Sequence, residues 1–290
     1  MKKYIILFPL YNDWKSLYKL SKEINDQIKG LSAKFSFLFI NDASSEPKAS
    51  FKLNLSKIDS IKIINMKKNQ LSGRCIATGL KYIIENEEFD YVIVMDSDGE
   101  DKPEYIINLV KKTEEFPNKT IVANRHRRLE NVIYKLMYSI HKIITLIFTS
   151  KLIKFGNFVC LPKNHIFKLL QDKNLWNSFS ATVAKIIDDK IYINADRGKR
   201  YFGPSKTSYL KLIHHSFTII SVFIKTVFLR TFLISIIYFA LTFGQISILT
   251  LFSLIVLLIF LIINLIISQR GNLSKLQNSL RNVKSIETLK

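Results

Sequence analysis

Residues 91–104 read YVIVMDSDGEDKPE, an apolar run that ends abruptly in carboxylates. The first five residues are typical of a buried strand. In extended backbone, side chains at positions i, i+2 and i+4 share one face, so Asp96, Asp98 and Glu100 could converge on one hard cation. Ligands of open α/β sheets bind at the carboxyl edge of such strands. The alternative is a polar turn whose acids cap a helix that begins at Pro103.

The chain before this turn predicts an α/β domain. Short apolar runs alternate with helical patterns, which indicates a mainly parallel sheet with nucleotide chemistry at its carboxyl edge. The sequence contains no Gly-x-Gly-x-x-Gly and no phosphate loop of the Gly-Lys-Ser kind, so hydride transfer and P-loop hydrolysis lose support. The expected strands cover residues 4–8, 35–40, 61–65 and 91–95. One expected helix follows the first strand and ends near residue 28, and a second covers residues 73–86.

A membrane hairpin is predicted near the end of the chain. From Thr231 to Ser268 there are 38 consecutive residues without Asp, Glu, Lys or Arg. One crossing needs roughly 20 helical residues, so this length predicts two spans, near 227–243 and near 246–268. Two buried core helices are the alternative, but residues 251–267 are apolar almost all the way round.

The distribution of charge predicts how the chain meets the membrane. Lysines and arginines flank both sides of the hairpin, whereas the turn between the spans has no charge. By the positive-inside bias, both flanks face the cytoplasm. We therefore expect an integral protein of the cytoplasmic membrane with a cytoplasmic catalytic domain at 1–210, a juxtamembrane helix and two spans at 211–268, and a basic cytoplasmic tail at 269–290.

The formal net charge of +20 suits either nucleic acid or anionic lipid. Apolar residues recur at helical spacing between Val132 and Phe148, with lysines around them, which is typical of a helix in the membrane interface. A helix that packs this stripe into the domain core is the alternative. Because a hairpin already anchors the chain, lipid is favoured and nucleic acid is not an expected partner.

Four ordered motifs resemble the family 2 inverting glycosyltransferases, a family with the GT-A fold. The first three are similar to Pro-x-Tyr-Asn-Glu, Val-Asp-Asp-Gly-Ser-Thr and Asn-x-Gly-x-x-x-Ala-x-x-x-Gly-Leu. The fourth is close to the Asp-Ala-Asp-Leu-Gln-x-x-Pro-Glu of the polyprenyl-phosphate sugar transferases, which include dolichol-phosphate mannose synthase. The likeness covers roughly residues 4 to 210, and the four segments are Pro9–Asp13, Phe39–Ser45, Asn69–Leu80 and Asp96–Glu104.

The resemblance implies a GT-A nucleotide-sugar-binding domain. Asp98, supported by Asp96 and Glu100, would hold Mg²⁺ or Mn²⁺ on the donor pyrophosphate, and Asp96 and Asp98 are the predicted catalytic residues. A cation held by oxygen ligands would stabilise the charge of the departing nucleoside diphosphate. The residues that would hold the nucleobase and ribose are Pro9, Tyr11, Asn12, Asp13 and Asp42.

Two basic segments resemble the acceptor motifs of the family. Residues 124–128 stand where the family has Gly-Ser-Arg, and residues 200–206 resemble Arg-x-x-Gly-Glu-Ser-Lys. Arginine offers a planar fork of donors to phosphate, to which Ser and Lys add a hydroxyl and a point charge. Solvated basic loops attracted to anionic lipid are the alternative. The resemblance implies that the acceptor phosphate is bound by Arg125, Arg128, Arg200, Ser205 and Lys206.

The sequence departs from the family pattern at four positions. Asn41 replaces an Asp, Leu71 replaces a Gly, Glu100 replaces a Gln and Pro204 replaces a Glu.

We expect transfer of a sugar from a nucleoside-diphosphate sugar to a polyprenyl phosphate, whose anionic oxygen needs no strong general base. Transfer to a hydroxyl of a lipid-linked glycan or glycerolipid would need such a base. An inactive GT-A scaffold at the membrane is the remaining alternative, and a homo-oligomer is compatible with all three.

Overall fold

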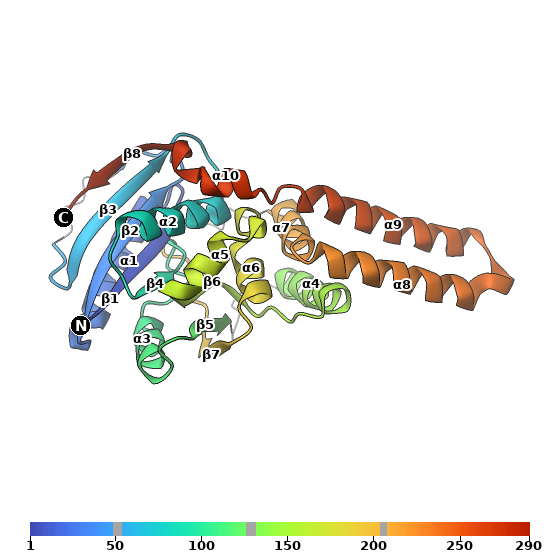
Figure 1. The fold of residues 1–290 in the computed structure, drawn as a ribbon, viewed down its shortest axis with the longest axis horizontal. Helices are drawn as coiled ribbons and strands as arrows, with labels where there is room; N and C mark the ends of the chain where they lie inside the picture. Colours follow the sequence, from blue (N-terminus) through green and yellow to red (C-terminus); the bar gives the residue numbers. More distant parts are fainter. Residues whose placement is uncertain (49–53, 126–131, 204–207) are drawn as a thin grey trace.

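The computed structural model describes residues 1–48, 54–125, 132–203 and 208–290. Figure 1 shows an α/β domain from which a long helical hairpin projects. The sheet has eight strands in the order β7-β5-β6-β4-β1-β2-β3-β8. The strands are β1 (Lys2–Leu10), β2 (Ala33–Asn41), β3 (Ile58–Met66), β4 (Tyr91–Val94), β5 (Thr120–Arg125), β6 (Phe155–Pro162), β7 (Lys190–Ala195) and β8 (Val283–Thr288).

The sheet is mainly parallel, as predicted. Strands β4, β1, β2 and β3 are parallel neighbours, and β7 is parallel to β5. Strand β6 runs antiparallel to both β4 and β5, and β8 runs antiparallel to β3. The expected strands are present and extend one to three residues beyond several of the predicted limits, because backbone pairing continues past the apolar residues that signalled them.

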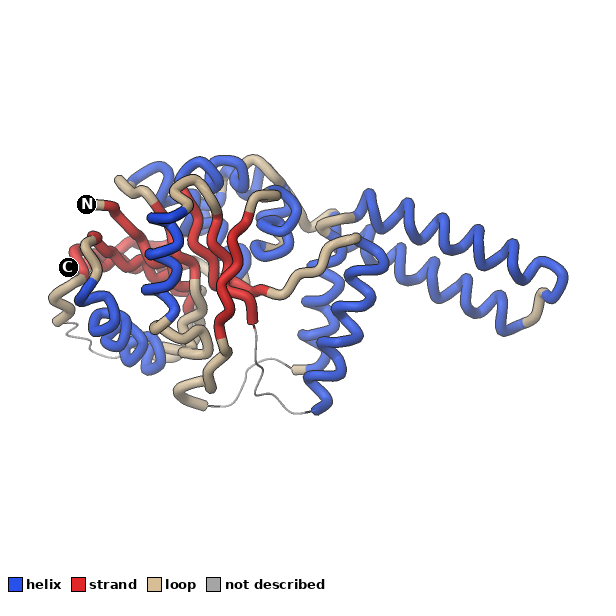
Figure 2. Tube along the Cα trace, turned by 90° about the horizontal axis from the view of Figure 1, so that it is seen from below, coloured by secondary structure: helices blue, strands red, loops and turns tan. Residues whose placement is uncertain are grey.

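Helices cover both faces of the sheet (Figure 2). On one face lie α2 (Ser72–Asn86), which packs on β1 residues such as Ile5 and Leu7, and α5 (Lys163–Leu170) and α6 (Phe179–Ile186), which pack on β6. On the other lie α1 (Trp14–Gln27) and α3 (Tyr105–Glu115), packed on Tyr4, Ile6 and Phe8. Since successive strand residues point to opposite faces, a sheet covered on both sides has the continuous apolar runs seen in the sequence.

The parallel strands end together at one edge of the sheet. Leu10 of β1 is paired with Asn41 of β2, and Leu7 of β1 is paired with Val94 of β4. The loops that follow these three strands therefore gather at the carboxyl edge, where open α/β sheets bind ligands. This register places the first, second and fourth sequence motifs side by side.

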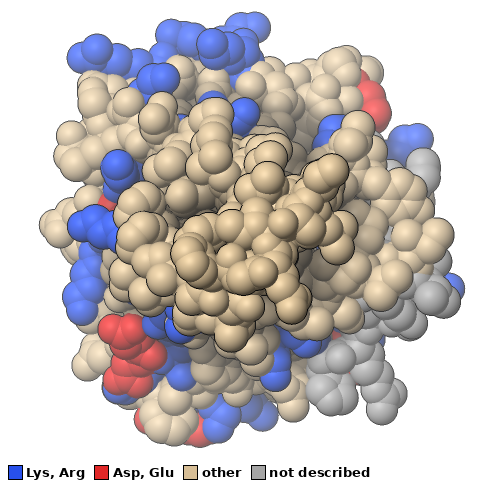
Figure 3. All heavy atoms as spheres, turned by 90° about the vertical axis from the view of Figure 1, so that its right-hand side faces the viewer, with Lys and Arg blue, Asp and Glu red and all other residues tan. Residues whose placement is uncertain are grey.

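The hairpin consists of α8 (Ile224–Thr242) and α9 (Ile248–Ser268). By length and composition both helices can cross a membrane, and their surfaces are largely exposed. Figure 3 looks along the hairpin and shows its surface without Lys or Arg, whereas basic residues surround it. An exposed apolar rod with a basic rim is not a pair of core helices.

Two further helices lie between the domain and the hairpin, α4 (Val132–Thr149) and α7 (Tyr209–Ser221). Ile144 and Phe148 of α4 pack against the core, and Phe148 lies 4.5 Å from Phe260 of α9 between ring centroids. Arg230 of α8 donates to the last carbonyl groups of α4, which stabilises that helix end. Six apolar side chains of α4 are exposed, those of Ile133, Leu136, Ile140, Ile143, Leu146 and Ile147.

The segment after the hairpin returns to the α/β domain. We predicted a basic tail from residue 269, and the structure adds that it contains α10 (Leu273–Gln277) and the edge strand β8. The Lys290 Nζ atom donates to the carbonyl oxygens of Leu55 and Ile58, at 2.7 Å and 2.5 Å. The tail thus covers the β3 edge of the sheet, which would otherwise present unpaired backbone groups.

Candidate active site at the carboxyl edge

The acidic turn after β4 depends on Gly99 and Asp101. Gly99 has φ +87°, and a Cβ atom there would collide with the ring of Tyr201, so only glycine fits. The buried Asp101 accepts a hydrogen bond from the Asp96 N–H at 3.0 Å. Asp98 Oδ1 accepts one from the Glu100 N–H at 3.0 Å. Asp101 therefore shapes the turn, while the half-buried Asp96 and Asp98 remain near its surface.

The three predicted metal ligands have different partners. Asp96 Oδ1 accepts from Asn157 Nδ2 at 2.9 Å, Asp98 Oδ2 lies 3.0 Å from Arg200 Nη1, and Glu100 is in an ion pair with Arg197. In the part of the chain that the structure describes, no three acidic, His or Cys side chains surround a common point for a metal ion. Asp96 and Asp98 nevertheless interact through their charges.

Negative charge accumulates in this turn. Burial, together with the charges of Asp96, Glu100 and Asp101, raises the pKa of Asp98 to about 7. Burial and the charge of Asp96 likewise raise the pKa of Asp101 to about 6. Like charges in a partly desolvated site disfavour ionisation, and a bound cation would relieve this repulsion. The carboxylate oxygens are the ligand type that Mg²⁺ and Mn²⁺ prefer.

Arg200 joins the acidic turn to the loop after β1. Its guanidinium group is in ion pairs with both Asp98 and Asp13, and the three side chains are 12–16% exposed. The next residue, Tyr201, donates its backbone N–H to the Asp98 carbonyl at 3.0 Å and its hydroxyl to Glu23 of α1. The segment that leads to α7 and the hairpin is therefore held over the carboxyl edge of the sheet.

Asp42, which the resemblance assigns to the nucleotide, holds a neighbouring loop. It is 3% exposed, and its two carboxylate oxygens accept from the backbone N–H groups of Gln70 and Leu71, at 2.5 Å and 2.9 Å. Burial raises the pKa of Asp42, and these hydrogen bonds oppose the shift. Leu71 has φ 71° and ψ 156°, a backbone conformation that is essentially restricted to glycine. The family pattern indeed has glycine at this position.

The other predicted nucleotide residues lie around the loop after β1. Pro9 is buried within β1, whereas the Tyr11 ring is 41% exposed. Asn12 links this loop to the one after β2: its backbone N–H donates to Ser44 Oγ and its side chain to Ser45 Oγ, both at 2.9 Å. The two loops thus form one unit beside the acidic turn.

Of the predicted acceptor residues, Arg125 and Arg200 are described, whereas Arg128, Ser205 and Lys206 lie outside the described residues. Arg125 ends β5 and packs against Gly156 of β6, where a Cβ atom would collide with the guanidinium group. Its positive charge lowers the pKa of Asp101. Arg125 and Arg200 therefore both place positive charge near the acidic turn, from separate segments.

Three residues near the acids were not singled out from the sequence. Arg197 could have been suggested by its spacing of three from Arg200 in one loop, whereas nothing around Asn157 marks it. The third residue is His215 of α7. Its side chain is exposed, yet desolvation lowers its pKa, with further lowering by Arg125 and His214 and an opposing effect of Asp96. These interactions place His215 within electrostatic reach of the acidic turn.

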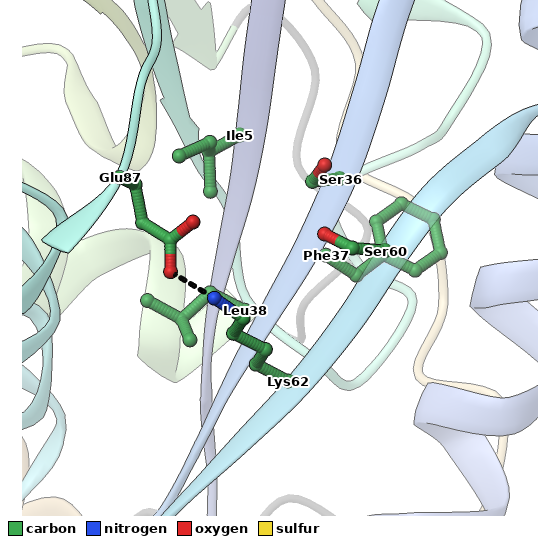
Figure 4. Close-up of a pocket in the computed structure, with 7 residues that line it drawn as sticks. All are labelled: Ile5, Ser36, Phe37, Leu38, Ser60, Lys62 and Glu87. Atoms are coloured by element: carbon green, nitrogen blue, oxygen red, sulfur yellow. Dashed lines mark hydrogen bonds and ion pairs between the residues drawn. The ribbon is translucent and has the colours of Figure 1, made fainter. Parts of the chain in front are cut away.

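A small cavity elsewhere in the domain is not a donor site. It lies against β1, β2 and β3 and has a volume of about 10 Å³, which is room for about one water molecule. Figure 4 shows Lys62 and Glu87 at its rim, joined by an ion pair of 2.6 Å. This cavity is therefore too small to hold a nucleotide sugar.

Comparisons with known proteins agree with this architecture. Residues 5–177 match the family described as glycosyl transferase family 2. Mannosyl-3-phosphoglycerate synthase from Rubrobacter xylanophilus has a similar structure, with a TM-score of 0.55, 12% identity and coverage of 76% of this chain and 72% of that chain. So does glucosyl-3-phosphoglycerate synthase from Mycobacterium tuberculosis in complex with Mn²⁺, uridine diphosphate and phosphoglyceric acid, with a TM-score of 0.56, 10% identity and 78% coverage of each chain.

At these identities the structural likeness shows the fold alone, and it confirms the predicted α/β GT-A architecture. The family match adds the chemistry, because it spans more than half of the chain and includes the loops after β1, β2 and β4. The protein is therefore a member of glycosyl transferase family 2, an enzyme that takes its sugar from a nucleotide sugar.

Proposed function

We propose that this enzyme transfers a sugar from a nucleoside-diphosphate sugar to a polyprenyl phosphate at the cytoplasmic face of the membrane, with inversion at the anomeric carbon. The observation that carries the proposal is the position of Arg200. This residue belongs to the segment that leads to the membrane helices, and it contacts Asp13 and Asp98 at the carboxyl edge. A phosphate at the membrane surface would therefore meet the donor beside Arg200.

On the donor side, the loops after β1 and β2 would bind the nucleoside. Tyr11, which is 41% exposed in this loop, would contact the base, and Asn12 and Ser44 hold the two loops together. Asp42 would act by positioning the 69–71 loop, because its carboxylate oxygens already accept two backbone hydrogen bonds. Asp13 is in an ion pair with Arg200, so it would bind the nucleoside once Arg200 turns away from it towards a phosphate.

Asp98 and Asp96 would hold Mg²⁺ or Mn²⁺. Two carboxylates suffice, since Mg²⁺ is usually bound by one or two carboxylates together with substrate phosphates. The raised pKa of Asp98 reflects its burial and the negative charge of the neighbouring carboxylates, and such a site fits a cation. When bound, the cation supplies positive charge that stabilises the departing diphosphate. Glu100 would tune the charge of the turn through its ion pair with Arg197.

On the acceptor side, Arg200 and Arg125 would bind the phosphate. Arg200 can exchange its carboxylate partners for phosphate oxygens without leaving the site, because a guanidinium group binds both in the same forked geometry. The exposed apolar faces of α4 and α7 would accommodate the polyprenyl chain near the hairpin. The anionic acceptor oxygen can attack directly, so no residue has to remove a proton from it.

One observation favours a second acceptor class. A hydroxyl acceptor would need a general base, and the buried Asp101 is occupied by the backbone of Asp96. His215 is the better candidate, because its lowered pKa keeps the imidazole neutral near neutral pH and it lies within electrostatic reach of Asp96. The alternative function is therefore transfer to a hydroxyl of a membrane lipid or a lipid-linked glycan.

The test is to incubate membranes that contain the enzyme with a panel of labelled nucleotide sugars and Mn²⁺, and to extract the lipids. Label that mild acid releases from the lipid fraction supports the polyprenyl phosphate acceptor. Acid-stable label supports the hydroxyl acceptor, in which case His215→Ala should abolish transfer. The absence of lipid-linked label with every donor would contradict both proposals. Membranes with the Asp98→Asn variant serve as the control.

A further inference from the structure

The C-terminal strand β8 is connected to the proposed nucleotide loop by a chain of side-chain hydrogen bonds. Glu287 Oε1 of β8 accepts from Asn65 Nδ2 of β3 at 2.6 Å. Asn65 Oδ1 accepts from Asn41 Nδ2 at the end of β2, at 2.8 Å. Asn41 Oδ1 in turn accepts from the backbone N–H of Ser44, at 3.0 Å. Three segments that are far apart in the sequence thus form one polar network.

The network has a direction that starts at Glu287. A carboxylate only accepts hydrogen bonds, so Glu287 turns the Asn65 NH₂ group towards β8, where it also donates to Ser285 Oγ at 3.1 Å, and the Asn65 oxygen towards Asn41. The Asn41 NH₂ group must then face Asn65, which leaves the Asn41 oxygen for the Ser44 N–H. Hydrogen bonds from Lys48 and Asn65 keep Glu287 ionised, because they lower its pKa.

This chain ends where the two nucleotide loops meet. Ser44 Oγ accepts from the backbone N–H of Asn12 at 2.9 Å, and Asn12 Oδ1 accepts from the Glu46 N–H at 3.0 Å. Asn12 has φ 54°, a left-handed conformation that side-chain hydrogen bonds of this kind stabilise in a non-glycine residue, and Ala43, next to Ser44, has the same φ. The position of Ser44 therefore affects both loops.

We propose that Glu287 is a positioning residue for the donor nucleotide: through the Asn65 and Asn41 amides it fixes the loop at 41–46. The segment that follows the membrane hairpin then completes the nucleotide site. This inference rests on the proposed role of the loops after β1 and β2, and it adds that donor affinity depends on a residue of the tail.

The test measures dissociation constants of uridine diphosphate and guanosine diphosphate, each with MnCl₂, by calorimetry on the full-length protein in detergent. Glu287→Gln keeps an acceptor oxygen for Asn65, so its affinity should stay within about 2-fold of the wild type. Glu287→Ala loses one charged hydrogen bond at the start of the chain, and its affinity should fall about 3- to 10-fold. Glu287→Lys places a donor where the Asn65 NH₂ group needs an acceptor, so it opposes the native amide orientation, and it should bind more weakly than Glu287→Ala.

Lys284→Gln is the matched control, because it neutralises an exposed charge on the same strand and should bind as the wild type does. Melting temperatures are measured for every variant. If Glu287→Ala and Glu287→Lys lower only the melting temperature and bind both nucleotides like the wild type, Glu287 merely stabilises β8 and the inference is overturned. If Glu287→Gln binds as weakly as Glu287→Ala, the acceptor direction of the network is overturned.

The same measurements separate this inference from the proposed function. Nucleotide binding by the wild type that is lost in Asp98→Asn supports the donor site, whatever the Glu287 variants do. If the wild type binds neither nucleotide, both the donor-site proposal and the role of Glu287 are overturned. If it binds and the Glu287 variants bind equally well, only the role of Glu287 fails.

Discussion

Arg200 Nη1 lies 3.0 Å from Asp98 Oδ2, although 102 residues separate the two in the sequence. The same guanidinium group contacts Asp13, so one side chain connects three segments of the site. Because the three side chains are only 12–16% exposed, solvent screens these ion pairs less than it would at an open surface. We infer that this arrangement holds the substrate-free site together, and that phosphate oxygens replace the carboxylates during turnover.

Replacing Arg200 by lysine should lower the rate of sugar transfer about 10- to 100-fold. A lysine ammonium group is a single point charge and cannot bridge Asp13 and Asp98 as the guanidinium fork does. The measurement is the initial rate of lipid-linked label formation. Lys199→Gln, an exposed basic residue in the same loop, is the control and should retain the wild-type rate. Full activity of Arg200→Lys would show that bridging is not required.

Asp98→Asn should lower transfer by a factor of at least about 100, since a neutral amide would hold the cation poorly and the leaving diphosphate would lose its stabilisation. Membrane insertion should be unaffected, because the hairpin lies outside the α/β domain. The comparison is Asp59→Asn, an exposed acid on β3 at the opposite end of the sheet. Unchanged turnover in Asp98→Asn would remove Asp98 from the cation site.

The affinity for Mn²⁺ should rise as the pH increases from 6 to 8. Burial raises the pKa of Asp98 to about 7, and a protonated carboxyl group does not bind the cation. Below this pKa the loss of one proton gives about a tenfold gain in affinity per pH unit, and above it the gain levels off. Titration of free Mn²⁺ by electron paramagnetic resonance measures the effect. A flat pH profile in the wild type would contradict the assignment of Asp98 as a cation ligand. The Asp98→Asn variant should bind Mn²⁺ weakly, and its affinity should not rise with pH in this way.

Leu71→Gly should stabilise the protein by about 1 kcal/mol. Leu71 has φ 71° and ψ 156°, and a non-glycine residue there costs about 1–3 kcal/mol, part of which is offset by the greater freedom of glycine in the unfolded chain. Little burial is lost, because the Leu71 side chain is 66% exposed. Thermal unfolding in detergent should show a rise of about 2–4 °C. Leu152→Gly, at a half-exposed leucine outside the left-handed region, should show no such rise.

Elements with a regular local pattern could be predicted from the sequence. The helix expected at 73–86 is α2 (Ser72–Asn86), and the uncharged segment from Thr231 to Ser268 forms most of the helical hairpin. The acidic turn lies at the carboxyl edge as expected, because a buried strand must end where its apolar run stops. These features depend on residues within a few positions of one another, whose period of 3.6 or 2 is written along the chain.

The partners of the site residues depended on how distant segments fold together. Arg197 and Arg200 reach Glu100 and Asp98 across about one hundred residues, and no local pattern indicates those pairs. Strand β8 is short and half polar, and it becomes a strand because β3 offers an unpaired edge to the returning chain. Periodicity reports which face of an element is buried, whereas ion pairs and edge pairing arise where the elements meet in space.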